Sequence, residues 1–185
     1  MSGSELGEIR ETFSGRRWHA ARGVTAVEVM IVVAILAVIM AMAGPTFSVF
    51  VGKNGNTAAE SEFVNALNFT RSEALRRGTP VVITASAPVA GNGFGNGWTI
   101  WVDANANGIR DVGEPVVRSR IAFTNGVVLG DGTVTQIAFN QQGYLTSGAA
   151  LQVKSCSSAA PGTTGYLVTI LPGGITDVQQ SVACP

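Results

Sequence analysis

A stretch of twelve residues, 103–114, places oxygen-bearing side chains at the intervals found in calcium-binding loops. Carboxylate, amide and carbonyl oxygens are the ligands that this hard cation prefers, and a central glycine lets such a loop turn sharply. In one interpretation the stretch is therefore a calcium site. Its ligands would be the side chains of Asp103, Asn105 and Asn107, the carbonyl of Ile109, Asp111 through a water molecule and bidentate Glu114, with Gly108 at the turn.

The segments that flank this stretch favour a second interpretation. Residues 98–102 and 115–121 are rich in Val, Ile, Trp and Arg and predict strands, whereas a loop of this calcium-binding type lies between two helices. The stretch would then be a hairpin loop in which Asp, Asn and Gly only form turns. The sequence leaves both interpretations open.

The two cysteines, Cys156 and Cys184, both lie in the last fifth of the chain. If this part of the protein is exported to an oxidising compartment, a disulfide is the expected state, and it would stabilise the fold by about 3–4 kcal/mol. Two unpaired buried thiols are the alternative. Two cysteines without a histidine supply only half the ligands of a structural zinc site, which argues against zinc.

Histidine and charge exclude several functions. The only histidine is His19, near the N-terminus, so the remainder of the chain lacks the base that Ser-His-Asp or Cys-His catalysis requires. After residue 23 the chain has eight basic and nine acidic residues, so no basic excess points to nucleic acid. We therefore expect that this protein is not an enzyme.

The first structural element expected from the sequence is an apolar run over residues 24–51. As a helix this run would be about 42 Å long, enough to cross a bilayer. Arg16, Arg17 and Arg22 precede it, and the positive-inside rule then keeps the N-terminus cytoplasmic. Glu28 lies within the run, where a carboxylate is costly without a partner. It is either functional or at the level of the lipid headgroups.

The remaining elements follow from periodicity. Residues 52–78 predict a second, amphipathic helix with Thr57 as its cap and Gly78 as its stop, packed on a sheet. Trp98 and Trp101 fall on opposite faces of one strand, so we expect one in the core and the other partly exposed. The buried face of the helix would hold Phe63, Ala66, Leu67, Thr70 and Ala74, and strands are expected at 80–86, 98–102, 116–123, 134–139, 151–154 and 166–171.

The residues Gly23-Val24-Thr25-Ala26-Val27-Glu28, followed by the apolar run, resemble the class III leader of type IV prepilins and type II secretion pseudopilins. The resemblance implies that a prepilin peptidase cleaves between Gly23 and Val24 and methylates Val24, at a position where the family usually has Phe. Glu28 matches the glutamate that neutralises the terminal amine of a neighbouring subunit. Pro45 matches the proline that kinks or melts the family's helix.

The segments 63–78, 97–105 and 113–118 are similar to the GspH/FimT group of minor pilins. This resemblance implies an α+β fold, in which a long N-terminal α-helix, membrane-spanning in its first half, packs on a C-terminal antiparallel β-domain of two sheets. The expected organisation is a cleaved leader at 1–23, a transmembrane and assembly helix at 24–51, the amphipathic helix at 52–78 and a periplasmic β-domain at 79–185.

The resemblance further implies a minor pilin or pseudopilin of a type IV pilus or type II secretion filament. Its partners would be other pilins, the prepilin peptidase, the inner-membrane assembly platform and membrane lipid, with one span and the β-domain in the periplasm. The alternative is an anchored periplasmic module that binds calcium or DNA. Some FimT-like proteins bind DNA through a Gly-Arg-x-Arg motif, but the corresponding residues here, Gly173-Gly174-Ile175-Thr176, lack both arginines, which argues against DNA.

Overall fold

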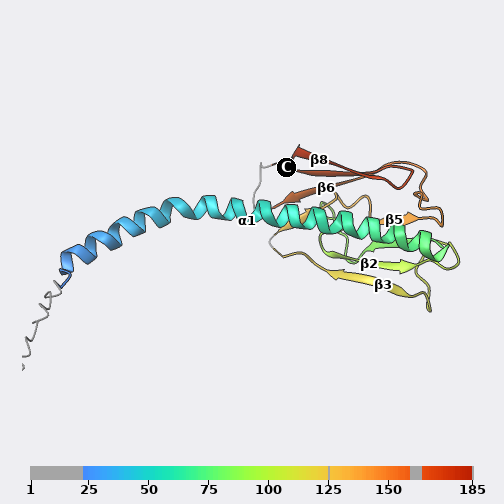
Figure 1. Cartoon of the computed structure of the whole chain (residues 1–185), viewed down its shortest axis with the longest axis horizontal. Coiled ribbons are helices and arrows are strands. Elements are labelled where there is room, and N and C mark those ends of the chain that lie inside the picture. The colour runs from blue at the N-terminus through green and yellow to red at the C-terminus, as the bar shows by residue number, and fades with distance from the viewer. Residues whose placement is uncertain (1–22, 125, 159–163, 185) are drawn as a thin grey trace, which may run out of the picture. The chain divides into compact units, whose positions relative to one another are not determined.

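The computed structural model describes residues 23–124, 126–158 and 164–184, with side chains for all of these except 42–49, 51, 52 and 181. The leader expected at 1–23 thus lies outside the described residues but for Gly23. One helix precedes eight strands in the described chain (Figure 1). These elements are α1 (Ala26–Arg77), β1 (Val81–Ala85), β2 (Gly97–Val102), β3 (Val116–Ile121), β4 (Val127–Leu129), β5 (Gln136–Phe139), β6 (Leu151–Ser157), β7 (Thr164–Ile170) and β8 (Thr176–Ala183).

The chain forms two units, residues 1–41 and 42–185, which are described separately. In the first unit, every described side chain of α1 is exposed, including Val27, Met30, Ile31 and Val38. Among the residues that the structure describes, no helical stretch combines the length and apolar character needed to cross a membrane.

Helix α1 runs through the position at which the sequence suggested the start of a second helix. The prediction of a separate helix capped by Thr57 is wrong, because α1 is continuous from Ala26 to Arg77. The Thr57 hydroxyl instead donates to the Lys53 carbonyl one turn earlier (3.1 Å), as a helix-interior threonine does. The helix ends as predicted at Gly78, whose positive φ of 65° suits the residue after a helix and whose amide donates to Ala74 (3.0 Å).

The strands form two four-stranded antiparallel sheets with the orders β3-β2-β1-β5 and β4-β6-β7-β8. The predicted α+β class with two antiparallel sheets is confirmed. All six predicted strands are present, but β4 and β8 were missed. β4 has only three residues, and β8 is a mostly polar strand at the edge of its sheet, so neither has the apolar alternation of a buried strand.

One core lies between the helix and both sheets. The predicted buried face of α1 is confirmed: Phe63, Ala66, Leu67, Thr70 and Ala74 are all buried. The Phe63 ring lies 5.0 Å from that of Phe94 and 5.5 Å from that of Trp98 on β2, and such aromatic pairs favour this tilted geometry. The second sheet contributes Leu129, Val153, Val168 and Ile170 to the same core.

Trp101 corrects the expectation that one tryptophan is partly exposed. Trp98 and Trp101 are each only 2% exposed. Trp98 belongs to the core, whereas the Trp101 indole donates to the Thr84 hydroxyl (3.0 Å) and lines a groove with Gly108 and Ile109. The loop after β2 therefore folds back over Trp101, an arrangement that strand alternation alone does not predict.

Candidate functional site

The predicted cleavage site lies just before the first turn of α1. Gly23 and Val24 are exposed, and apart from its chain neighbours no described residue lies within 4 Å of the position that a Cβ on Gly23 would occupy. Thr25 and Glu28 then bond reciprocally. The Glu28 amide donates to the Thr25 hydroxyl (3.2 Å), and Glu28 Oε2 accepts from the Thr25 amide (3.1 Å) and hydroxyl (3.2 Å).

This pattern is a capping box, in which an N-cap threonine and a glutamate three residues later satisfy each other's backbone amides. The carboxylate also lies at the positive end of the helix dipole. Glu28 therefore helps to cap the helix that contains it. The Thr-x-x-Glu pattern of residues 25–28 is the sequence signal for this role, which was not among the predictions. Pro45 lies within α1, which continues across it, and its side chain is outside the described ones.

The loop of residues 103–114 brings the six candidate calcium ligands into one segment between β2 and β3. Its two outer carboxylates bind backbone amides. Asp103, only 3% exposed, accepts from the amides of Asn107 (3.1 Å) and Gly108 (2.8 Å). Glu114 accepts from the amides of Ala104 (2.8 Å) and Asp111 (2.9 Å). All four oxygens of these two groups thus hold the loop backbone.

The inner ligands also bond to one another. Asp111 Oδ2 accepts from the side-chain amides of Asn105 and Asn107, each at 2.8 Å. The Asn107 side-chain oxygen accepts from the Ile109 amide (2.7 Å), and Gly108 has the positive φ of 74° that the predicted sharp turn requires. The loop is further held by the Gln136 side chain, which donates to the Gly108 carbonyl (2.9 Å).

These bonds favour the turn interpretation of the loop. Each carboxylate oxygen that accepts a backbone amide has one lone pair fewer to offer a cation, and its position is set by the backbone. Within the described residues, no group of three His, Cys, Asp or Glu side chains is arranged to hold a metal ion. Calcium binding by this loop stays a prediction.

The predicted pairing of the cysteines is confirmed. Cys156 on β6 and Cys184, directly after β8, form a disulfide with Cα atoms 5.9 Å apart. Gly165 on β7 lies between them, and a Cβ at this position would be 2.7 Å from the Cys184 sulfur and would collide with the Ser155 carbonyl. Only glycine fits here without a shift of the neighbouring backbone.

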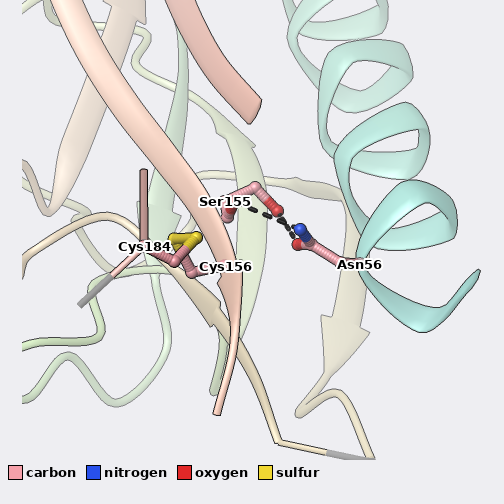
Figure 2. The surroundings of a disulfide bond; sticks show 4 residues. All are labelled: Asn56, Ser155, Cys156 and Cys184. Carbon is pink, nitrogen blue, oxygen red and sulfur yellow. Dashed lines mark hydrogen bonds between the residues drawn. A yellow bond between two sulfur atoms is a disulfide. The ribbon is translucent and has the colours of Figure 1, made fainter. Parts of the chain in front are cut away.

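Next to the disulfide, a buried polar pair joins α1 to β6 (Figure 2). The Asn56 side chain donates to the Ser155 carbonyl (3.2 Å) and accepts from the Ser155 hydroxyl. Both residues are at most 3% exposed. Sequence patterns do not predict this pair, because 99 residues separate its members and Asn56 precedes the expected cap at Thr57.

The stretch compared with a DNA-binding motif forms the turn between β7 and β8. Its Gly173 carbonyl accepts from Arg71 of α1 (3.2 Å), and the same guanidinium donates to the Gly143 carbonyl (3.0 Å). Arg71 therefore holds two turns together. The stretch supplies no cation of its own.

The described chain is thus an α+β domain, with a helix packed on two antiparallel sheets and a disulfide near the end of the second sheet. The family model for the type II transport protein GspH matches residues 59–174, more than half of the sequence, and the chain belongs to this family. The predicted kinship with GspH/FimT-like minor pilins is thereby confirmed.

Solved structures share the fold. The type IV minor pilin FimU of Pseudomonas aeruginosa strain PAO1, in its P21 crystal form, is 21% identical with a TM-score of 0.58, over 72% of this chain and 96% of FimU. In its P65 form the values are 22% and 0.53, over 69% of this chain and 95% of FimU. No curated protein matches the chain.

Proposed function

We propose that this chain is a minor pilin or pseudopilin that enters a type IV pilus or type II secretion filament through the N-terminal part of α1. Membership in a family of pilin-type structural subunits supports this role. In the filament its partners are other pilin subunits, and before assembly the β-domain lies in the periplasm.

The observation that carries the proposal is the difference between the two parts of α1. From residue 26 to 41 the exposed side chains are apolar on all sides of the helix, apart from Glu28. From residue 53 onwards only one stripe is buried, and polar side chains occupy most of the rest. A helix that is apolar all round needs a lipid or protein environment, whereas a one-sided helix needs a single sheet surface.

The sequence supports a membrane span before assembly. The uninterrupted apolar run of residues 29–43 continues into the residues whose side chains are not described. The prepilin peptidase then cleaves between Gly23 and Val24 and methylates Val24. The exposure of Gly23 and Val24 supports cleavage at this bond.

The test is the identity of the first residue. The chain should be expressed with a prepilin peptidase, extracted from the membrane fraction and analysed by mass spectrometry. We expect Val24, methylated, as the first residue. Gly23→Leu should keep the leader, because a cleavage pocket shaped for glycine has no room for a side chain. An unprocessed Met1 start in the native chain, with the peptidase active on another prepilin, would contradict the proposal.

A further inference from the structure

A small polar pocket lies where α1 meets the ends of β6, β7 and β8, near the buried pair of Asn56 and Ser155. Its volume is about 120 Å³. At about 30 Å³ per water molecule, this is room for about four waters, enough for one tetrahedral oxyanion and too little for a drug-sized ligand. The pocket is lined by the polar side chains of Lys53, Thr57, Ser157, Thr164, Tyr166 and Gln180.

One buried hydroxyl in this pocket lacks a partner. Ser157 is 4% exposed, and its Oγ has no hydrogen-bond partner among the described residues. Burying a hydroxyl without a partner costs about 1–3 kcal/mol, so such groups are rare in folded proteins. Its neighbour Ser155, two residues earlier on the same face of β6, is satisfied by Asn56. The Ser157 hydroxyl is thus available to a bound group.

The remaining lining supplies donors and no carboxylate. Thr57 and Tyr166 hold their hydroxyl oxygens 2.9 Å apart; since the Thr57 proton goes to the Lys53 carbonyl, Tyr166 donates to Thr57, and this pair forms part of the wall without a free donor. Thr164 and Gln180 add a hydroxyl and an amide. Lys53 is exposed, and the ion pairs found among the described residues do not include it. One cation beside several neutral donors, with no Asp or Glu, is the chemistry that suits a phosphate group.

The position of Lys53 along the chain identifies the source of that phosphate. It lies two residues beyond the apolar run of 24–51 and 25 residues beyond Glu28. As a helix, 25 residues rise about 38 Å, against about 30 Å for the hydrocarbon core and 40–45 Å for a bilayer with its headgroups. If the run spans the membrane, as proposed above, Lys53 falls at the level of the phosphates of the periplasmic leaflet.

We propose that this pocket binds the phosphate of an anionic phospholipid headgroup and so fixes the depth of the β-domain on the membrane before assembly. Lys53 supplies the charge, and the hydroxyls of Ser157 and Thr164 donate to the phosphate oxygens. The inference rests on the proposed membrane anchor. A Lys near an anionic surface contributes enough attraction for about a fivefold change in affinity.

The test uses the processed full-length chain in detergent, titrated with phosphatidylglycerol and followed by native mass spectrometry. We expect Lys53→Ala and Ser157→Ala each to weaken lipid retention about fivefold or more. Lys154→Ala is the matched control, since Lys154 is the only other lysine of the chain and lies outside this pocket, and it should retain lipid like the native protein. Ser157→Ala should not lower the melting temperature, because the hydroxyl it removes has no partner in the protein.

Two further arms separate the outcomes. Millimolar inorganic phosphate should compete with the lipid in the native chain and have less effect in Ser157→Ala. The headgroup proposal would be overturned if all variants retained lipid equally. It would also be overturned if the native chain bound inorganic phosphate but did not retain phosphatidylglycerol. Membrane association is checked in parallel by flotation with vesicles of phosphatidylethanolamine and phosphatidylglycerol. A chain that floats but shows no effect of Lys53 refutes only this inference, whereas a chain that does not float refutes the anchor as well.

Discussion

At the scale of single residues, Glu28 has two roles that use the same carboxylate. In the single chain it caps its own helix by accepting from Thr25. In the proposed filament it pairs with the terminal amine of a neighbouring subunit. Both roles place a negative charge at a helix N-terminus, where the helix dipole favours it. Since the cap uses one oxygen, Oε2, the two roles need not exclude each other.

Replacing Glu28 by Gln separates these roles. Glutamine keeps the capping box but removes the charge, whereas Glu28→Ala removes both. If the charge pair drives assembly, both variants should be cleaved and inserted but absent from purified filaments. Immunoblots of sheared filaments against whole membranes measure this directly. Incorporation of Glu28→Gln at the native level would assign the residue to capping alone.

Asp103 allows a similar test in the loop after β2. Its buried carboxylate accepts from the amides of Asn107 and Gly108, and the Asn107 amide also donates to Asn105 Oδ1 (3.1 Å). Asp103→Ala therefore leaves the Gly108 amide unpaired and should destabilise the domain by about 1–3 kcal/mol. Asp103→Asn, which keeps one acceptor oxygen, should cost less. Thermal unfolding of the processed chain in detergent measures both effects.

The same experiment tests calcium. From the hydrogen bonds of the loop, we expect equal melting temperatures in EDTA and in millimolar calcium. A calcium site would instead raise the stability of the native chain by about 2.7 kcal/mol at a hundredfold excess over Kd. A rise of this kind that is lost in Asp103→Ala would establish the metal site and the role of Asp103 as a ligand.

At the scale of elements, periodicity predicted the parts of the fold that depend on an apolar face. The buried stripe of α1 around Phe63 and Leu67 follows from helical spacing, and six strands follow from their β-branched and aromatic residues. The helix start predicted at Thr57 was wrong, because a threonine before an amphipathic stretch can cap a helix but can also lie inside one. Contacts distant in sequence override that local signal: Asn56 bonds to Ser155, and the Thr57 hydroxyl lies 2.9 Å from that of Tyr166.

Strand periodicity likewise could not predict the covering of Trp101. Alternation places this residue on the face of the sheet opposite Trp98, and a soluble sheet can leave that face open. The loop that closes over it is held by the bond between Gln136 and the Gly108 carbonyl, and this bond joins segments 28 residues apart. The calcium-like pattern was therefore visible in the sequence, but its structural role was not.

Helix α1 contains one carboxylate whose burial works against stability. Glu60 is 8% exposed, and this burial raises the pKa of its carboxyl above the usual value, although a hydrogen bond from Ser61 acts in the other direction. The folded protein therefore holds this proton more tightly than the unfolded chain. The ionised carboxylate lowers stability at pH values above the raised pKa, and the loss disappears as pH falls through it.

We therefore expect Glu60→Gln to raise the melting temperature at pH 7, with a gain that shrinks as the pH is lowered through the raised pKa. Glu62→Gln is the matched control, because Glu62 lies on the same helix two residues further along. Glu62 is half-exposed and pairs with Arg120 at 2.9 Å, so its loss should lower stability by less than about 1 kcal/mol. A Glu60→Gln variant that is less stable than the native chain at pH 7 would show that the carboxylate has a partner.

At the scale of the whole molecule, β8 is an edge strand that pairs with one neighbouring strand. It pairs with β7 along its length and forms the edge of the second sheet. Beyond this ladder, the disulfide from Cys184 to Cys156 ties the end of the chain to β6, one strand further in. The pairing was predictable from export and cysteine count, but the need for Gly165 between the two cysteines was not, since it depends on the approach of three strands.

Removing this bond should release the C-terminal strand before the rest of the domain. The closed loop spans 28 residues in sequence, so the chain-entropy model gives a loss of about 3–4 kcal/mol for the double variant Cys156→Ser, Cys184→Ser. Because the core between α1 and the sheets does not depend on the cysteines, we expect the variant to stay folded and hydrogen exchange to rise first in β8. Hydrogen exchange with mass spectrometry on native, reduced and variant protein measures this order, and the reduced native chain should match the variant. Equal protection of β8 in all three samples would mean that pairing with β7 alone holds the strand, and that the disulfide stabilises the domain only through its unfolded state.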